Sequence, residues 1–215
     1  MKTRVRNITS ILIAALFCSV FFSACTGMKG GLAEEKPVAL QPLTGIVVMP
    51  TVMVKESVVK AGKDDSTLDS VVGFVDGVIS AELGKNNKVH IVTEGQLDAL
   101  LTDAAGGRLA QMKALGAKLD SNAVLEVTVT RFQERDGSDL SVNFPASAAF
   151  ELVLTHVDSG MVLWAASFDE TQEALSSNLL TLGKVKNRGF KWITVEDLVR
   201  QGLKERLADC PYLQK

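Results

Sequence analysis

AVLEVTVTRF at Ala123–Phe132 and FELVLTHVDSGMVLWAASF at Phe150–Phe168 alternate apolar and polar residues with a period of two. In the first of these segments Leu125 and Val127 point one way while Glu126 points the other. This period is typical of strands that bury one face. We therefore expect three successive strands joined by turns, at Ala123–Phe132, Ala149–Val157 and Met161–Phe168.

The second turn of this meander has its own sequence signal. Val157-Asp158-Ser159-Gly160-Met161 fits a three-residue hairpin loop in which Gly160 adopts the left-handed region. The turn sets the register of the hairpin. It places side chains from both strands on one face of the sheet. They are Phe150, Leu152, Leu154 and His156 from the first strand, and Phe168, Ala166, Trp164 and Val162 from the second. Trp164 is thus expected in the core.

The preceding half of the chain alternates between strand and helix patterns. Residues 45–50 are a continuous apolar run ended by proline, which indicates a strand buried on both faces. Helical spacing follows at 66–83, a second strand at 88–92, a capping box of Thr93 and Gln96 that starts the next helix, and one further short helix at 109–115. We predict an α/β fold of the α+β sandwich type. It would hold a mixed sheet of about five strands, a C-terminal three-strand antiparallel meander, and helices packed on one face.

Composition and the first residues indicate an exported protein. The chain has 215 residues, 47% of them hydrophobic, and a net charge of −2. Lys2, Arg4 and Arg6 precede an apolar run at 11–22 that is shorter than the roughly 20 residues of a membrane-spanning helix. We expect residues 1–24 to be a signal peptide. Its removal leaves an acidic chain, which disfavours nucleic acid as a partner.

Phe22-Ser23-Ala24-Cys25 resembles the lipobox of bacterial lipoproteins. The resemblance implies cleavage before Cys25, a diacylglyceryl thioether on its sulfur and an acylated new N-terminus. Thr26, in place of an aspartate, implies sorting to the outer membrane in a Gram-negative cell. Residues 25–43 carry glycines and prolines without periodicity and form the expected lipidated tether, whose reach is roughly 23 Å for about 18 flexible residues.

The C-terminal part, residues 169–215, is expected to be a helical extension packed on a domain at 44–168. Thr194–Leu207 has the pattern of a final helix, with Thr194 as its cap. A basic and aromatic run precedes this helix and is our candidate partner surface: Lys186, Arg188, Phe190, Lys191 and Trp192. Trp192 has two interpretations at this stage, a contact residue for a partner or a plug between the last helix and the sheet.

No constellation in the sequence predicts catalysis. The two histidines, His90 and His156, each fall within a predicted strand, so a hydrolytic triad or a standard zinc site is not expected. We predict no catalytic residue, no metal and no cofactor. Once Cys18 is removed and Cys25 lipidated, Cys210 is left without a cysteine to pair with, and we expect it to be buried or passively exposed.

The order of these elements resembles a known family. IVVMP (46–50), VHIVTEGQLDALL (89–101), Ala123–Phe132 and Phe150–Phe168 are similar to the periplasmic domain of curli-secretion-channel-type lipoproteins. That group includes lipoprotein activators of peptidoglycan synthases and a flagellum-associated outer-membrane lipoprotein, and a similar domain opens the periplasmic Tol translocation protein. The resemblance covers about 44–168.

The resemblance implies a binding or assembly module rather than an enzyme. We expect a lipid-anchored protein that faces the periplasm from the outer membrane and acts as an adaptor or regulator of another envelope protein complex. The alternative is a subunit of a homo-oligomeric secretion or envelope assembly. An envelope hydrolase is a third hypothesis, and it rests only on the presence of carboxylates.

Overall fold

A computed structural model of the chain describes residues 40–54, 65–102, 104, 106–138, 142–172 and 192–214. In this part of the chain a six-stranded mixed sheet has the order β3-β1-β4-β7-β8, with β2 also paired to β4. Its strands are β1 (Ile46–Val48), β2 (Val52–Met53), β3 (Val89–Ile91), β4 (Ala123–Gln133), β7 (Ser147–His156) and β8 (Val162–Thr171). β5 (Asp136–Gly137) and β6 (Val142–Phe144) form a separate small ladder. The predicted α/β class with a mixed sheet is confirmed.

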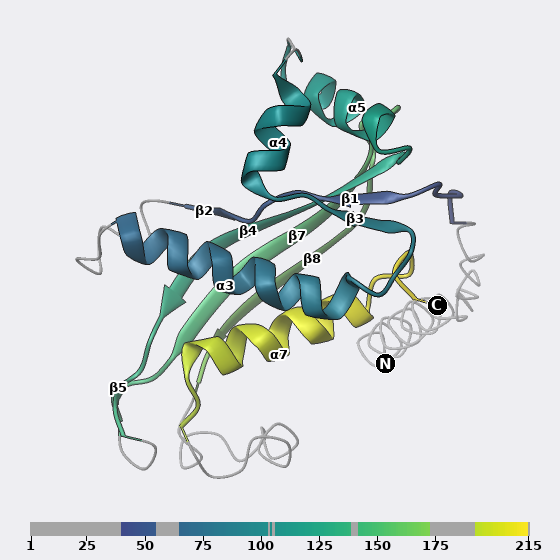
Figure 1. Ribbon diagram of the computed structural model, residues 1–215. Coiled ribbons are helices and arrows are strands. Elements are labelled where there is room, and N and C mark those ends of the chain that lie inside the picture. The colour runs from purple at the N-terminus through teal and green to yellow at the C-terminus, as the bar shows by residue number, and fades with distance from the viewer. Residues whose placement is uncertain are drawn as a thin grey trace, which may run out of the picture. The chain divides into compact units, whose positions relative to one another are not determined.

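Two long helices lie side by side on one face of the sheet (Figure 1). They are α3 (Asp65–Leu83) and the C-terminal α7 (Val195–Ala208). The apolar side of α7 is buried, through Val195, Leu198, Val199, Leu203 and Leu207. Because these side chains join the same core cluster as α3 and the sheet, α7 completes the main core of the domain.

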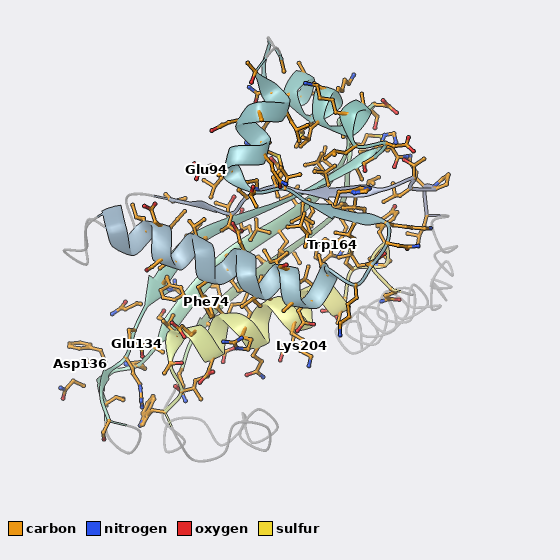
Figure 2. The ribbon with its side chains drawn as sticks, in the orientation of Figure 1. Phe74, Glu94, Glu134, Asp136, Trp164 and Lys204 are labelled. Carbon is orange, nitrogen blue, oxygen red and sulfur yellow. The ribbon has the colours of Figure 1, made fainter. Side chains whose placement is uncertain are left out.

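The centre of this core is an aromatic stack between neighbouring strands. Phe150 of β7 pairs with Phe168 of β8, and their ring centroids lie 4.9 Å apart at an interplanar angle of 15°. Leu152 pairs with Ala166 and Leu154 with Trp164, as the hairpin register predicted. Trp164 is partly buried against this core (Figure 2).

The hairpin departs from the predicted register at its end. A register shift follows Leu154, so that Thr155 pairs with Val162 and His156 does not. Gly160 has a φ of 70°, which confirms the left-handed turn residue. The strands are also longer than the apolar pattern indicated, because pairing continues to Ser147 and Thr171, whose hydroxyl oxygens lie 2.9 Å apart.

The other two helices of the described residues lie on the opposite face of the sheet, which corrects the prediction that the helices cover one face. They are α4 (Glu94–Leu101) and α5 (Arg108–Lys118), at the top of Figure 1. A second core cluster forms beneath them: Val47, Val92, Met112, Leu115, Val124 and Val157. The physical reason is that β1 and the start of β4 are apolar on both faces, and each face must be covered.

Local capping signals work as the sequence predicted. Thr93 Oγ1 accepts a hydrogen bond from the backbone N–H of Gln96, and Gln96 Oε1 accepts one from the N–H of Thr93. Thr194 caps α7 by accepting from the N–H of Asp197. Each bond satisfies an amide that the first helical turn leaves unpaired.

Gly202 of α7 lies directly against the ring of Phe168 on β8. An added Cβ would lie 2.7 Å from two ring carbons of Phe168. We predict that Gly202→Ala lowers the free energy of unfolding by about 1–3 kcal/mol in denaturant titrations, because overpacking outweighs the better helix propensity of alanine.

The matched control is Gly73 in α3, where an added Cβ would meet no heavy atom within 4 Å. Gly73→Ala should raise the free energy of unfolding by about 0.5–1 kcal/mol. Equal stabilisation by both substitutions would show that α7 is not docked on Phe168.

Candidate functional site

The candidate partner surface lies mostly outside the described residues. Lys186, Arg188, Phe190 and Lys191 belong to the segment 173–191, of which the structure describes nothing. Trp192 is described, and it is half-buried. Of this surface the structure therefore describes Trp192, together with the residues around it, which we call the base of the segment.

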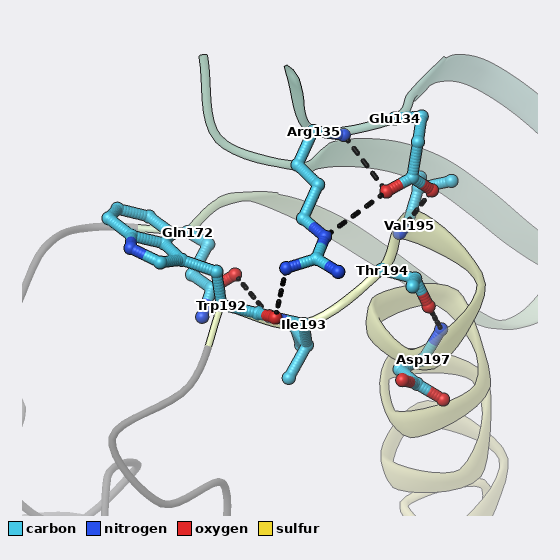
Figure 3. Close-up of polar contacts among 8 residues, drawn as sticks. All are labelled: Glu134, Arg135, Gln172, Trp192, Ile193, Thr194, Val195 and Asp197. Atoms are coloured by element: carbon cyan, nitrogen blue, oxygen red, sulfur yellow. Dashed lines mark hydrogen bonds and ion pairs between the residues drawn. The ribbon is translucent and has the colours of Figure 1, made fainter. Parts of the chain in front are cut away.

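The base of the segment is held by hydrogen bonds from two strands (Figure 3). Arg135, just after β4, donates from Nη1 to the backbone oxygen of Trp192 at 2.9 Å. Gln172, just after β8, accepts from the backbone N–H of Ile193 through Oε1 at 2.9 Å. The last residue before the segment and the second residue after it are thus joined directly.

Glu134 connects the same base to the first turn of α7 (Figure 3). Its Oε2 accepts from the backbone N–H of Val195 at 3.0 Å. Its Oε1 accepts from the N–H of Arg135 at 3.0 Å and lies 3.8 Å from Arg135 Nε. A carboxylate at this position also interacts favourably with the positive end of the helix dipole.

We call Glu134, Arg135, Gln172 and the backbone of 192–195 the latch. Its groups hold the backbone in place, so its chemistry is that of a rigid support and not of acid–base catalysis. The sequence analysis missed Glu134, Arg135 and Gln172, because an adjacent acid and base or a single glutamine has no distinctive spacing.

The two histidines lie on different strands. His90 is exposed on β3, and His156 on β7 has Nδ1 3.0 Å from Ser159 Oγ. β1 and β4 lie between β3 and β7 in the sheet. Within the described ranges, no three residues of His, Cys, Asp or Glu come together in a way that could hold a metal ion.

The structure describes Cys210 but not Cys25. Cys25 falls outside the described residues. Cys210 is fully buried in the main core, and burial raises the pKa of its thiol. Of the two expected states of Cys210, buried or passively exposed, the structure shows the buried one. A buried thiol of raised pKa is a poor nucleophile.

In the part of the chain that the structure describes, no helix is both long enough and apolar enough to cross a membrane.

Comparison with known proteins gives no family assignment. No family model matches the chain, and no curated protein matches it in sequence. Similar solved structures include the PelC dodecamer from Paraburkholderia phytofirmans, with 13% identity, a TM-score of 0.45, and coverage of 80% of this chain and 89% of that chain.

Two further structures are similar at lower scores. Lipoprotein GNA1162 from Neisseria meningitidis has 17% identity and a TM-score of 0.38, covering 67% of this chain and 92% of that chain. The LpoB C-terminal domain from Salmonella enterica has 12% identity and a TM-score of 0.37, covering 61% of this chain and 86% of that chain. Likeness at this level assigns no function.

Glu126 is a partly buried carboxylate on the face of β4 that α5 approaches. Burial raises the pKa of this carboxyl above its ordinary value of 4.5, while the charge and hydrogen bonds of Arg108 act in the opposite direction. The guanidinium of Arg108, the first residue of α5, forms an ion pair with this carboxylate. The folded protein therefore binds the Glu126 proton more tightly than the unfolded chain does.

Stability should consequently fall as the pH rises from about 4.5 through the raised folded pKa of Glu126. We predict that Glu126→Gln removes this loss, so that its free energy of unfolding improves relative to wild type between about pH 4 and about pH 7. Denaturant titrations at both pH values measure the difference. Glu151→Gln, on the exposed face of β7, controls for loss of one negative charge. If the free energy of unfolding of the wild type rises relative to that of Glu126→Gln on going to neutral pH, the prediction is wrong.

The latch predicts a local effect at the start of α7. Glu134→Ala should lower the free energy of unfolding by about 1 kcal/mol, because the N–H of Val195 loses its acceptor and the helix dipole loses a counter-charge. Amide hydrogen exchange at Val195 should accelerate, while the exchange at Leu203 should change less. Glu134→Gln keeps an acceptor oxygen and should retain most of the protection. Unchanged exchange at Val195 in Glu134→Ala would rule out this role.

Proposed function

We propose that this chain is a lipid-anchored module of the bacterial cell envelope that binds another envelope protein and acts as its adaptor or regulator. The single observation that carries the proposal is the Phe22–Cys25 lipobox followed by a tether that ends on a folded domain. Anchoring through Cys25 in the outer membrane would hold the domain in the periplasm, within reach of partners in that compartment.

The contact between tether and domain supports this arrangement. Asn122, just before β4, accepts from the N–H of Thr44 through Oδ1 at 2.9 Å and donates through Nδ2 to the oxygen of Pro42 at 3.2 Å. Pro42 and Thr44 are thus held against the residue that precedes β4. A roughly 23 Å reach would let the domain turn toward partners without leaving the membrane.

The latch supports a binding role for the C-terminal surface. It holds Gln172, Trp192 and Ile193 together, and these residues flank the segment that carries Lys186, Arg188, Phe190 and Lys191. Arginine and aromatic side chains are enriched where protein partners bind most tightly. We place the partner contact here and expect no catalytic role for these residues.

A homo-oligomeric assembly is the second candidate. β8 ends the strand order of the described sheet, and Val162–Phe168 of this strand contains neither a charged residue nor proline. Edge strands of this kind readily pair with another strand unless they are protected. Pairing of β8 between copies is the specific contact that this candidate requires.

Cross-linking in intact cells, followed by mass spectrometry, tests the proposal. Wild-type protein should remain in the membrane fraction and cross-link to one dominant foreign protein, while Cys25→Ala should release a folded protein and lose that product. Trp192→Ala should reduce the yield of the product by about tenfold, as expected for a contact worth about 1.4 kcal/mol or more. Phe144→Ala removes an exposed aromatic on β6 and serves as the control.

The outcomes separate the candidates. A ladder of the protein with itself would favour the homo-oligomer, and cross-links within β8 would identify the contact. Cys25→Ala protein that stays in the membrane fraction would overturn anchoring. A large fall in the thermal midpoint of Trp192→Ala would show instead that Trp192 plugs the last helix onto the sheet.

A further inference from the structure

One end of the sheet carries the junction with the tether. Ile46 of β1 pairs with Ala123 of β4, and Ala123 pairs with His156 of β7, so these three residues form one row at that end. Beyond this row, the side chain of Asn122 binds Pro42 near the end of the tether and Thr44 at the start of the domain. Its backbone oxygen accepts from the N–H of Val157. Pro42 and the β7–β8 turn therefore lie at the same end of the sheet.

This end also displays apolar side chains to solvent. Leu109 of α5 is 39% exposed, and Met161 and Val162 after the β7–β8 turn are 55% and 59% exposed. Leu109 lies against the turn from which Met161 and Val162 follow, since an added Cβ on Gly160 would lie 3.2 Å from Leu109 Cδ2. We call Leu109, Met161 and Val162 the apolar tip. Contiguous exposed apolar groups are more informative than scattered ones.

The backbone that presents the tip is fixed. His156 donates its N–H to the oxygen of Met161 at 2.9 Å, and Gly160 donates its N–H to the oxygen of His156 at 2.8 Å. Ser159 Oγ lies 3.3 Å from the N–H of Met161 and accepts from it. The tip would therefore lose little conformational entropy on docking, which favours binding by a small surface.

The helix beside the tip is basic. α5 contains Arg108, Lys113 and Lys118 and no acidic residue, and all three basic side chains are exposed. Arg108 is paired with Glu126, and Asp120 and Asp158 lie on the adjoining turns, so the positive charge belongs to the helix and not to the whole end. Apolar groups flanked by lysine and arginine are typical of surfaces that rest on anionic lipid headgroups.

We propose that the apolar tip docks on an anionic lipid surface, the membrane that holds the acyl chains of Cys25. This inference rests on the proposed anchoring of Cys25. Leu109, Met161 and Val162 enter the boundary between headgroups and acyl chains, and Lys113 lies among the headgroups. Docking orients the domain, so that β5 and β6, at the other end of the long strands in Figure 1, face away from the membrane.

The anchor makes a small docking surface sufficient. Several acyl chains supply the affinity for the membrane, because each buried methylene contributes about 0.8 kcal/mol. A tether with a reach of roughly 23 Å then keeps the tip at an effective concentration in the millimolar range near the lipid. Weak contacts that would not hold a free protein can therefore set the orientation of a tethered one.

Depth-dependent quenching of a fluorophore tests the docking on lipidated protein in phosphatidylethanolamine and phosphatidylglycerol vesicles with nitroxide-labelled headgroups. The label is attached to Ala110→Cys, next to Leu109, or to Phe144→Cys on β6, where the native side chain is 62% exposed. Cys210 is buried and should not react, so unsubstituted protein provides the labelling blank. Flotation of the vesicles measures anchoring separately.

We expect quenching at position 110 to exceed that at position 144 by about twofold or more, since the tip would lie within about 5–10 Å of the headgroup boundary. Leu109→Ser/Met161→Ser/Val162→Ser should abolish the difference without changing flotation. Equal quenching at both positions in floating protein would overturn the docking alone. The same holds if the fluorescence change at position 110 depends on protein density and not on the nitroxide. Protein that does not float would overturn the anchor and the docking together.

Discussion

The change along β4 from burial on both faces to burial on one face determines how the layers of this protein are arranged. Ala123, Val124 and Leu125 are all buried, whereas Glu126, Thr128 and Thr130 are only partly buried on the outer face. An apolar face must be covered to be removed from water. The sheet is therefore covered by helices on both faces where β4 starts, and by α3 and α7 on a single face farther along.

The same change lies between two ends of the sheet that make different contacts. The end where β4 starts receives the tether at Asn122 and presents the apolar tip. The other end carries Glu134 and Arg135, which hold the return of the chain into α7. β4 runs between the two ends and pairs with β7 from Ala123 to Gln133.

Much of the fold could be predicted because it depends on short-range patterns. The period of two in β4, β7 and β8, the glycine turn at Gly160 and the caps at Thr93 and Thr194 each involve neighbours in sequence. The prediction that the helices cover one face was wrong, although the local pattern itself indicated two covered faces. A strand at 45–50 buried on both faces already requires a layer on each side of the sheet.

The sequence by itself determined the fold class, the meander register from Phe150 to Leu154, the caps and the candidate export signal, because each is written in adjacent residues or in a simple period. Only the tertiary structure decided where α4 and α5 lie, that Gly202 meets Phe168, and that Glu134, Arg135 and Gln172 converge on residues 192–195. The reason is physical: Glu134 and Val195 are far apart along the chain, and their contact depends on the packing of α7 against β7 and β8.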